Sequence, residues 1–122
     1  KVKIDFVQED IQSLSYLNRT FDIIVSNPPY IHPDEKKDIS PNVLNHEPHM
    51  AIFTPNNDPI YFYRLIINFA SKVLKSLGGL YLEINPKFLE LLKSNFSSRN
   101  FSEVEVRNDI FGKPRMLKVI KK

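Results

Sequence analysis

The chain has 122 residues, of which 42% are hydrophobic and 25% are charged, and its formal net charge is +3. These values are ordinary for one soluble globular domain, and no apolar run reaches the roughly 18 residues that a membrane-spanning helix needs. The absence of cysteine excludes disulfides, thiolate metal sites and a cysteine nucleophile, and it suits a cytoplasmic protein. The positive charges are scattered apart from a basic tail, which we interpret as solvated, so a nucleic-acid partner is not expected.

Two strands are predicted in the first third of the chain. Val2, Ile4 and Phe6 alternate with polar residues over 2–8, which predicts a strand. Residues 22–26 form a short continuous apolar run, which is typical of a strand covered on both faces in a parallel sheet. The start of the chain has no secretory signal and no initiator Met, so we expect it to be part of a longer protein.

A long segment without sustained periodicity follows, over residues 31–59, and it contains five prolines. An irregular segment of this length in a compact domain is usually functional or disordered. We therefore expect it to be a loop beside a substrate.

A strongly periodic segment comes next and predicts a helix of four to five turns. Asp58-Pro59 marks its start and Gly78-Gly79 its end. Its predicted buried stripe contains Ile60, Phe62, Tyr63, Ile66, Ile67, Phe69, Ala70, Val73, Leu74 and Leu77.

The last third of the chain predicts a strand over 80–84, a second helix after Asn85-Pro86, and strands over 103–107 and 115–120. The short connection around Gly112 favours an antiparallel hairpin between the last two strands. The order of elements predicts an α/β fold with a parallel sheet.

The stretch "SNPPY" supplies the main functional hypothesis. Asn27 directly follows a predicted strand, at the sheet edge where doubly wound folds bind ligands. Pro28 and Pro29 lack N–H groups and fix φ, so the turn presents the Asn27 side-chain oxygen and the Pro28 carbonyl as acceptors beside the Tyr30 ring. Two acceptors and a ring match a planar NH₂ group, with stacking worth about 0.5–1.5 kcal/mol. Such acceptors orient an amide nitrogen toward a strong electrophile, and a sulfonium methyl group is the obvious candidate.

"NPPY" after an apolar strand resembles a motif of S-adenosylmethionine-dependent methyltransferases that act on amino groups, including adenine-N6 methyltransferases. With "HEPHMAIFTPNND", "YFYRLIINFASKVLKSLGGLYLEI" and "NDIFGKPRMLKV", the chain resembles the HemK-type glutamine methyltransferases of peptide-chain release factors from Phe6 to Val119. The resemblance implies part of a Rossmann-like seven-stranded methyltransferase sheet that lacks the first strands and the Gly-rich cofactor loop. Residues 1–122 would form a single domain, the C-terminal portion of a class I methyltransferase domain, with 31–59 as its substrate-side loop.

The same resemblance implies the cofactor S-adenosylmethionine, a glutamine-bearing loop of a release factor as substrate, and roles for individual residues. The catalytic residues would be Asn27, Pro28 and Tyr30, the substrate contacts Asn27, Pro28, Pro29, Tyr30, Glu47 and Pro48, and the cofactor contacts Asp10 and Asn27. One departure is Asn85-Pro86-Lys87, which stands where the family usually has Gly and a nearby Gln.

Several alternatives stay open. An adenine-N6 methyltransferase would act on the same kind of NH₂ group, and the non-enzymatic alternative is a fragment that binds nothing well.

No metal site is expected from His46 and His49, because their spacing lies off a predicted helix and cysteine is absent. Glu83 needs a partner if it is buried, in either a structural or a functional role, and we interpret Arg115 as an ion-pair anchor. Without its neighbouring strands the chain is expected to self-associate through an open strand edge and to be inactive alone.

Overall fold

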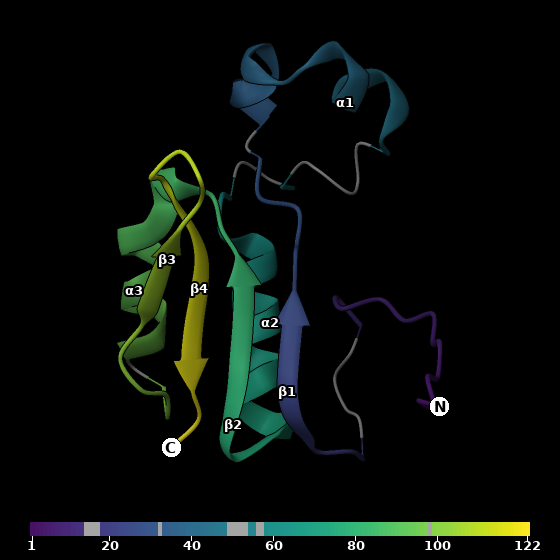
Figure 1. Cartoon of the computed structure of the whole chain (residues 1–122), viewed down its shortest axis with the longest axis vertical. Coiled ribbons are helices and arrows are strands. Elements are labelled where there is room, and N and C mark those ends of the chain that lie inside the picture. Colours follow the sequence, from purple (N-terminus) through teal and green to yellow (C-terminus); the bar gives the residue numbers. More distant parts are fainter. Residues whose placement is uncertain (14–17, 32, 49–53, 56–57, 98) are drawn as a thin grey trace.

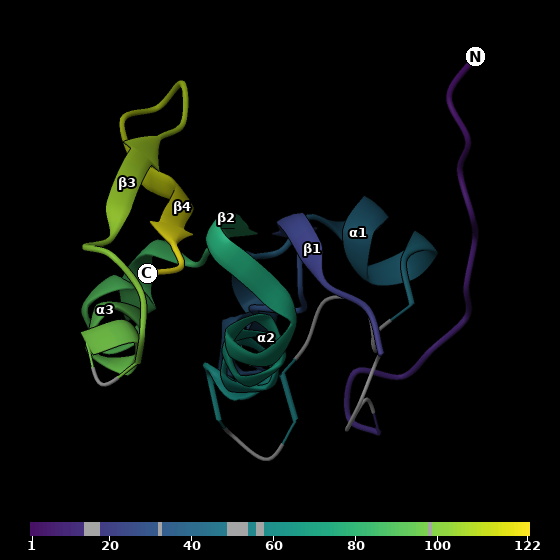
Figure 2. The ribbon, with the colours of Figure 1, turned by 90° about the horizontal axis from the view of Figure 1, so that it is seen from below.

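The computed structural model describes residues 1–13, 18–31, 33–48, 54–55, 58–97 and 99–122. Four strands form one mixed sheet in the order β1-β2-β4-β3 (Figure 1). Figure 2 shows α2 and α3 on the same side of this sheet. The predicted α/β class is therefore confirmed.

The strands combine one parallel pair with an antiparallel hairpin. β1 (Phe21–Ser26) pairs in parallel with β2 (Leu74–Glu83). β4 (Pro114–Ile120) lies antiparallel between β2 and β3 (Glu105–Asn108). The hairpin predicted around Gly112 is thus confirmed, and Gly112 has a φ of 77° in its turn, a conformation that favours glycine.

The core lies between the sheet and two helices, α2 (Tyr61–Val73) and α3 (Leu89–Ser97). A 3₁₀ turn, η3 (Pro86–Phe88), leads into α3, and the Asn85 side chain accepts a hydrogen bond from the Lys87 N–H at its start, 3.1 Å away. The predicted cap is therefore confirmed. The core cluster comprises Ile60, Tyr63, Ile66, Ile67, Ala70, Leu74, Leu80, Leu82, Ile84, Leu92, Phe96, Phe101, Leu117 and Val119.

The end of α2 differs from its prediction. The helix stops at Val73, whereas the apolar stripe predicted that it reached Leu77, and Leu77 is 79% exposed with a φ of 66°. The physical reason lies far along the chain. The Lys121 ammonium donates to the carbonyls of Ser71 and Leu74 at 2.7 and 2.8 Å, and so caps the helix end.

Two short helices interrupt the segment that was predicted to be irregular. They are η1 (Pro33–Asp38) and α1 (Pro41–His46), and each begins at a proline, which suits the first helical position. Figure 1 shows both beyond the carboxyl ends of β1 and β2. These two helices therefore lie at the edge of the sheet where a ligand is expected.

The strand predicted over 2–8 is wrong. These residues form no strand, and Val2, Ile4 and Phe6 are exposed. An alternating pattern becomes a strand only when a neighbour satisfies its backbone N–H and C=O groups, and among the described residues no strand lies beside this segment.

The expectation that β1 is covered on both faces is also wrong. Ile23 and Val25 are 61% and 75% exposed, because α2 and α3 cover only the opposite face. β1 is also an edge strand, with β2 as its one neighbour in the sheet described here. Within the described part of the chain, no helix has the length and apolar character needed to cross a membrane.

Candidate amide-binding site

The four residues after β1 line a small cavity. Asn27 is exposed, Pro28 is buried and Tyr30 is half-buried. The cavity has a volume of about 290 Å³ and is lined by Asn27, Pro28, Pro29, Tyr30, Ile31, Ile39, Val43 and Glu47. This volume lies at the small end of ligand sites and suits one side chain or one ring.

The structure therefore brings together five of the predicted site residues, from two different parts of the chain. Glu47 ends α1, where its backbone N–H donates to the Val43 carbonyl at 3.1 Å. The Glu47 carboxylate thus comes to the cavity from the segment 31–59, and the Asn27 side-chain amide comes from the end of β1. Pro48 is exposed and lies outside the cavity lining.

The hydroxyl of Tyr30 ties this turn to the sheet. It donates a hydrogen bond to Glu83 Oε1 at 2.8 Å, and the ring packs against the core cluster. Burial, with the neighbouring Glu83 carboxylate, raises the pKa of Tyr30 above its ordinary value, so the hydroxyl stays protonated and keeps donating. Glu83 thus has the hydrogen-bond partner that we expected for a carboxylate in a strand.

The backbone around Glu83 is held as well. The Tyr63 hydroxyl donates to the Glu83 carbonyl at 2.8 Å, and burial raises the pKa of Tyr63 above its ordinary value. The Glu83 side-chain carboxylate therefore accepts from Tyr30 on the turn, and the Glu83 backbone carbonyl accepts from Tyr63 on α2. These contacts fix the end of β2 beside the end of β1.

Asn85 is the link that the sequence did not reveal. It is 6% exposed, and its Nδ2 donates to the Tyr30 carbonyl at 3.1 Å and to Glu35 Oε2 at 3.0 Å. The sequence indicated a helix cap at Asn85 and a departure from the family that the chain resembles, but neither identified its hydrogen-bond partners. Its partners lie 55 and 50 residues away, so no local pattern could have found them.

The two predicted acceptors belong to residues that line the small cavity. No group in the described residues donates a hydrogen bond to the Asn27 side-chain oxygen or to the Pro28 carbonyl. The prolines have no N–H of their own to compete for these oxygens. The arrangement can accept both hydrogens of an NH₂ group.

Other predicted residues lie apart from this cavity. Asp10 sits in an exposed turn, where its Oδ1 accepts from the Gln12 N–H at 2.9 Å, and Gln12 in turn accepts from the Tyr61 hydroxyl at 3.1 Å. His46 is exposed, while His49 and His32 lie outside the described residues. Arg115 bonds to Asp109 Oδ2 at 3.3 Å through two nitrogens, which confirms the ion-pair anchor.

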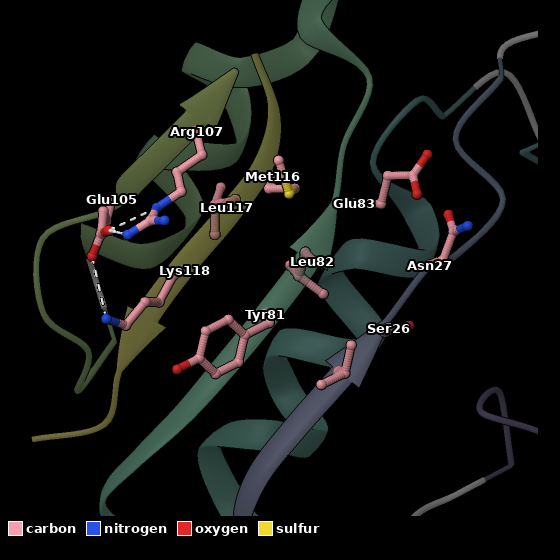
Figure 3. Close-up of a pocket in the computed structure, with 11 residues that line it drawn as sticks. Ser26, Asn27, Tyr81, Leu82, Glu83, Glu105, Arg107, Met116, Leu117 and Lys118 are labelled. Carbon is pink, nitrogen blue, oxygen red and sulfur yellow. Dashed lines mark hydrogen bonds and ion pairs between the residues drawn. The ribbon is translucent and has the colours of Figure 1, made fainter. Parts of the chain in front are cut away.

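Two further hollows adjoin the turn. A cavity of about 750 Å³ lies on the other side of Tyr30, sharing Tyr30, Ile31 and Ile39 with the small cavity and reaching Asn85 and Arg115. A hollow of about 590 Å³ lies on the open sheet face, and Figure 3 shows Asn27 and Glu83 at one end of it. Asn27 is therefore shared between the small cavity and the open face.

No family model matches the chain. Three similar proteins are methyltransferases by name. A release factor glutamine methyltransferase of Flavobacterium psychrophilum is 43% identical over 119 residues, which cover 98% of this chain and 42% of that protein. One of Bacteroides thetaiotaomicron is 39% identical over 116 residues, covering 94% of this chain and 42% of that protein. A bifunctional methyltransferase of Rickettsia felis is 41% identical over 97 residues, covering 80% of this chain and 18% of that protein.

The chain spans less than half the length of these relatives. The region aligned with the Flavobacterium protein nevertheless covers 98% of the chain. It therefore contains the NPPY turn, helices α2 and α3 and the hairpin. A four-stranded mixed sheet with helices on one face fits a part of a Rossmann-like methyltransferase domain. The chain is therefore related to the release factor glutamine methyltransferases over almost its whole length.

Proposed function

We propose that this chain is the substrate-amide part of an S-adenosylmethionine-dependent methyltransferase, and that the parent protein methylates the side-chain amide nitrogen of a glutamine in a peptide-chain release factor. The observation that carries the proposal is the cavity in which Asn27, Pro28 and Tyr30 meet Glu47 at the carboxyl end of β1. The similarity to release factor glutamine methyltransferases supports the same assignment.

The turn would act by orientation and electrostatics. Asn27 Oδ1 and the Pro28 carbonyl would accept the two amide hydrogens and so hold the nitrogen with its lone pair, which lies perpendicular to the amide plane, directed at the electrophile. Bound S-adenosylmethionine supplies that electrophile as a sulfonium methyl group. Held by Asn27 and Pro28, the amide nitrogen would gain this methyl group and release one proton to solvent, while the sulfur would keep the electron pair of the broken S–C bond. No strong base is needed, because the methylated nitrogen is far more acidic than the starting amide.

We propose that Asp10 would hold one end of this cofactor. Asp10 is exposed, and its turn is tied through Gln12 to Tyr61 at the start of α2, so its carboxylate suits the amine or hydroxyl groups of the adenosine end. The methionine end needs a backbone cradle rich in glycine. The three glycines of the chain lie elsewhere, since Gly78 and Gly79 are in β2 and Gly112 is in the hairpin turn. We therefore assign Asp10 and Asn27 to the cofactor and place the cradle in another part of the parent protein.

Charge favours a polypeptide over a nucleic acid as substrate. Among the described residues that line the small cavity, Glu47 is the charged one, and none is Lys or Arg. A nucleotide would bring its phosphates to this acidic rim, whereas nucleic-acid sites usually present clustered basic side chains. An adenine-N6 methyltransferase is therefore the less favoured function.

The test uses the full-length parent protein with radiolabelled S-adenosylmethionine. Wild-type protein should label a release factor and leave an adenine-containing oligonucleotide unlabelled. Asn27→Ala should lower kcat by about 10²–10³, the usual effect of removing one preorganised polar group at a reacting centre.

Asn45→Ala is the matched control, because Asn45 is exposed on α1 and does not line the cavity. Its turnover should stay within about twofold of the wild type, as expected for a surface substitution. Labelling of the oligonucleotide instead of the release factor would replace the proposed substrate, and normal turnover by Asn27→Ala would remove the proposed role of the turn.

A further inference from the structure

We infer that Asn85 is a positioning residue for the amide-accepting turn. The inference rests on the proposed function and adds to it the group that holds the turn in place. Asn85 follows β2, whereas the turn follows β1, so the contact joins the carboxyl ends of two neighbouring parallel strands.

The Asn85 side chain uses each of its polar atoms. Oδ1 accepts from the Lys87 N–H, and Nδ2 donates one hydrogen to the Tyr30 carbonyl and the other to Glu35 Oε2. These partners identify which end of the Asn85 side-chain amide is the nitrogen, because only an NH₂ group can donate to two acceptors. With 6% of its surface exposed, the side chain has little access to water as a substitute partner.

The two groups that accept from Asn85 Nδ2 belong to different parts of the site. The Tyr30 carbonyl is two residues from Pro28, so holding it fixes the backbone that carries the accepting carbonyl. Glu35 lies on η1, in the segment that also supplies Ile39 to the small cavity, so the same NH₂ group holds the turn and the wall opposite it. A shift of about 1 Å in such a group is enough to slow chemistry on the order of 10²-fold.

Asn85→Asp separates these roles within one side chain of nearly the same shape. The aspartate still accepts from the Lys87 N–H, but it has no hydrogen for Tyr30 or Glu35. We expect kcat to fall on the order of 10-fold to 100-fold with little change in the KM for S-adenosylmethionine. Asn85→Ser, which keeps the cap without placing a charge beside Glu35, should lower kcat similarly and covers the case in which the aspartate variant does not fold.

Adding Glu35→Gln to Asn85→Asp tests which bond matters. The introduced glutamine can donate to the introduced aspartate and restore that link with its direction reversed, while the Tyr30 carbonyl stays unsatisfied. The double variant should therefore regain only part of the lost thermal stability, because Glu35→Gln also removes the ion pair with the Lys87 ammonium, and it should not regain kcat. Full recovery of kcat would show that the contact to Glu35 alone is functional and would overturn the inference.

Amide hydrogen exchange gives a readout that does not depend on activity. Asn85→Asp should speed exchange in a peptide covering residues 27–39 and leave peptides from α2 and β4 unchanged. Asn95→Asp is the matched control, because it removes a donor to the Leu91 carbonyl on the exposed side of α3. Unchanged exchange over 27–39 would overturn the positioning role, whereas faster exchange in a protein that does not methylate a release factor would retain it and reject the proposed function.

Discussion

Replacing Tyr30 with Phe should separate the hydroxyl from the ring at the centre of the site. The hydroxyl donates to the Glu83 carboxylate at 2.8 Å, and the pair is partly buried. A hydrogen bond to a charged group contributes about 1.5–3 kcal/mol, and partial solvent access places this one at the lower limit. We therefore expect Tyr30→Phe to lower the free energy of unfolding by about 1.5 kcal/mol.

Equilibrium urea denaturation of the parent protein, followed by circular dichroism, measures this change. Glu83→Gln keeps an acceptor for the hydroxyl and should cost about 1 kcal/mol, since a neutral bond replaces a charge-assisted one. The double variant should cost less than the sum of the two, because Tyr30→Phe removes the same contact that Glu83→Gln weakens. Tyr81→Phe is the control on the open face, and its effect should stay within about 0.5 kcal/mol.

Activity should respond differently from stability. Tyr30→Phe retains the ring beside the amide, so most turnover should remain in conditions where the protein is folded, whereas Tyr30→Ala should lose much more. Additive effects of Tyr30→Phe and Glu83→Gln, or a loss for Tyr30→Phe no larger than for Tyr81→Phe, would refute the reasoning from this contact.

Three other predictions concern the frame around the site. The backbone N–H of Lys113, followed by other donors including Arg115, holds the pKa of Asp109 below its ordinary value. Its stabilising effect is therefore present above a pH of about 4 and lost as pH falls through the lowered pKa, so the melting temperatures of Asp109→Ala and wild type should differ at pH 7 and converge at strongly acidic pH. Leu77→Gly should raise the free energy of unfolding by about 1 kcal/mol through relief of its positive φ, and a denaturation midpoint below that of wild type would contradict this. The 122-residue chain should self-associate in light scattering through the β1 edge, and Val25→Lys should reduce the association; an unchanged scattering mass would locate the contact elsewhere.

Local sequence patterns predicted the parts of the fold that depend on near neighbours. Most of the stripe from Ile60 to Leu74 is buried as expected, with Phe62 and Phe69 half-buried, because helical spacing alone places those side chains on one face. Asn85 begins a short helical turn as predicted, because a cap depends on the next two residues. The NPPY turn falls at the carboxyl end of β1 for the same local reason.

The remaining features depend on contacts between distant residues. Leu77 continues the apolar period but is exposed, because Lys121 caps α2 four residues earlier. The bonds of Tyr30 to Glu83 and of Asn85 to Glu35 each join segments about 50 residues apart. Periodicity carries no information about such pairs. The strand prediction over 2–8 is wrong for a related reason. The alternation of apolar and polar residues does not show whether another strand lies beside the segment.

The place of β4 in the sheet has a consequence for how the protein is made. β4 lies between β2 and β3, and both of its neighbours are synthesised before it. A nascent chain that has not yet reached Pro114 therefore carries two unpaired strand edges, with Leu80 and Leu82 of β2 lacking the residues that they face in β4. Exposed edges and apolar surface in a partly made domain are the features that chaperones shield and that aggregation exploits. A pause in translation before β4 would thus be more hazardous than one after it, and a premature stop there would remove the middle of the sheet.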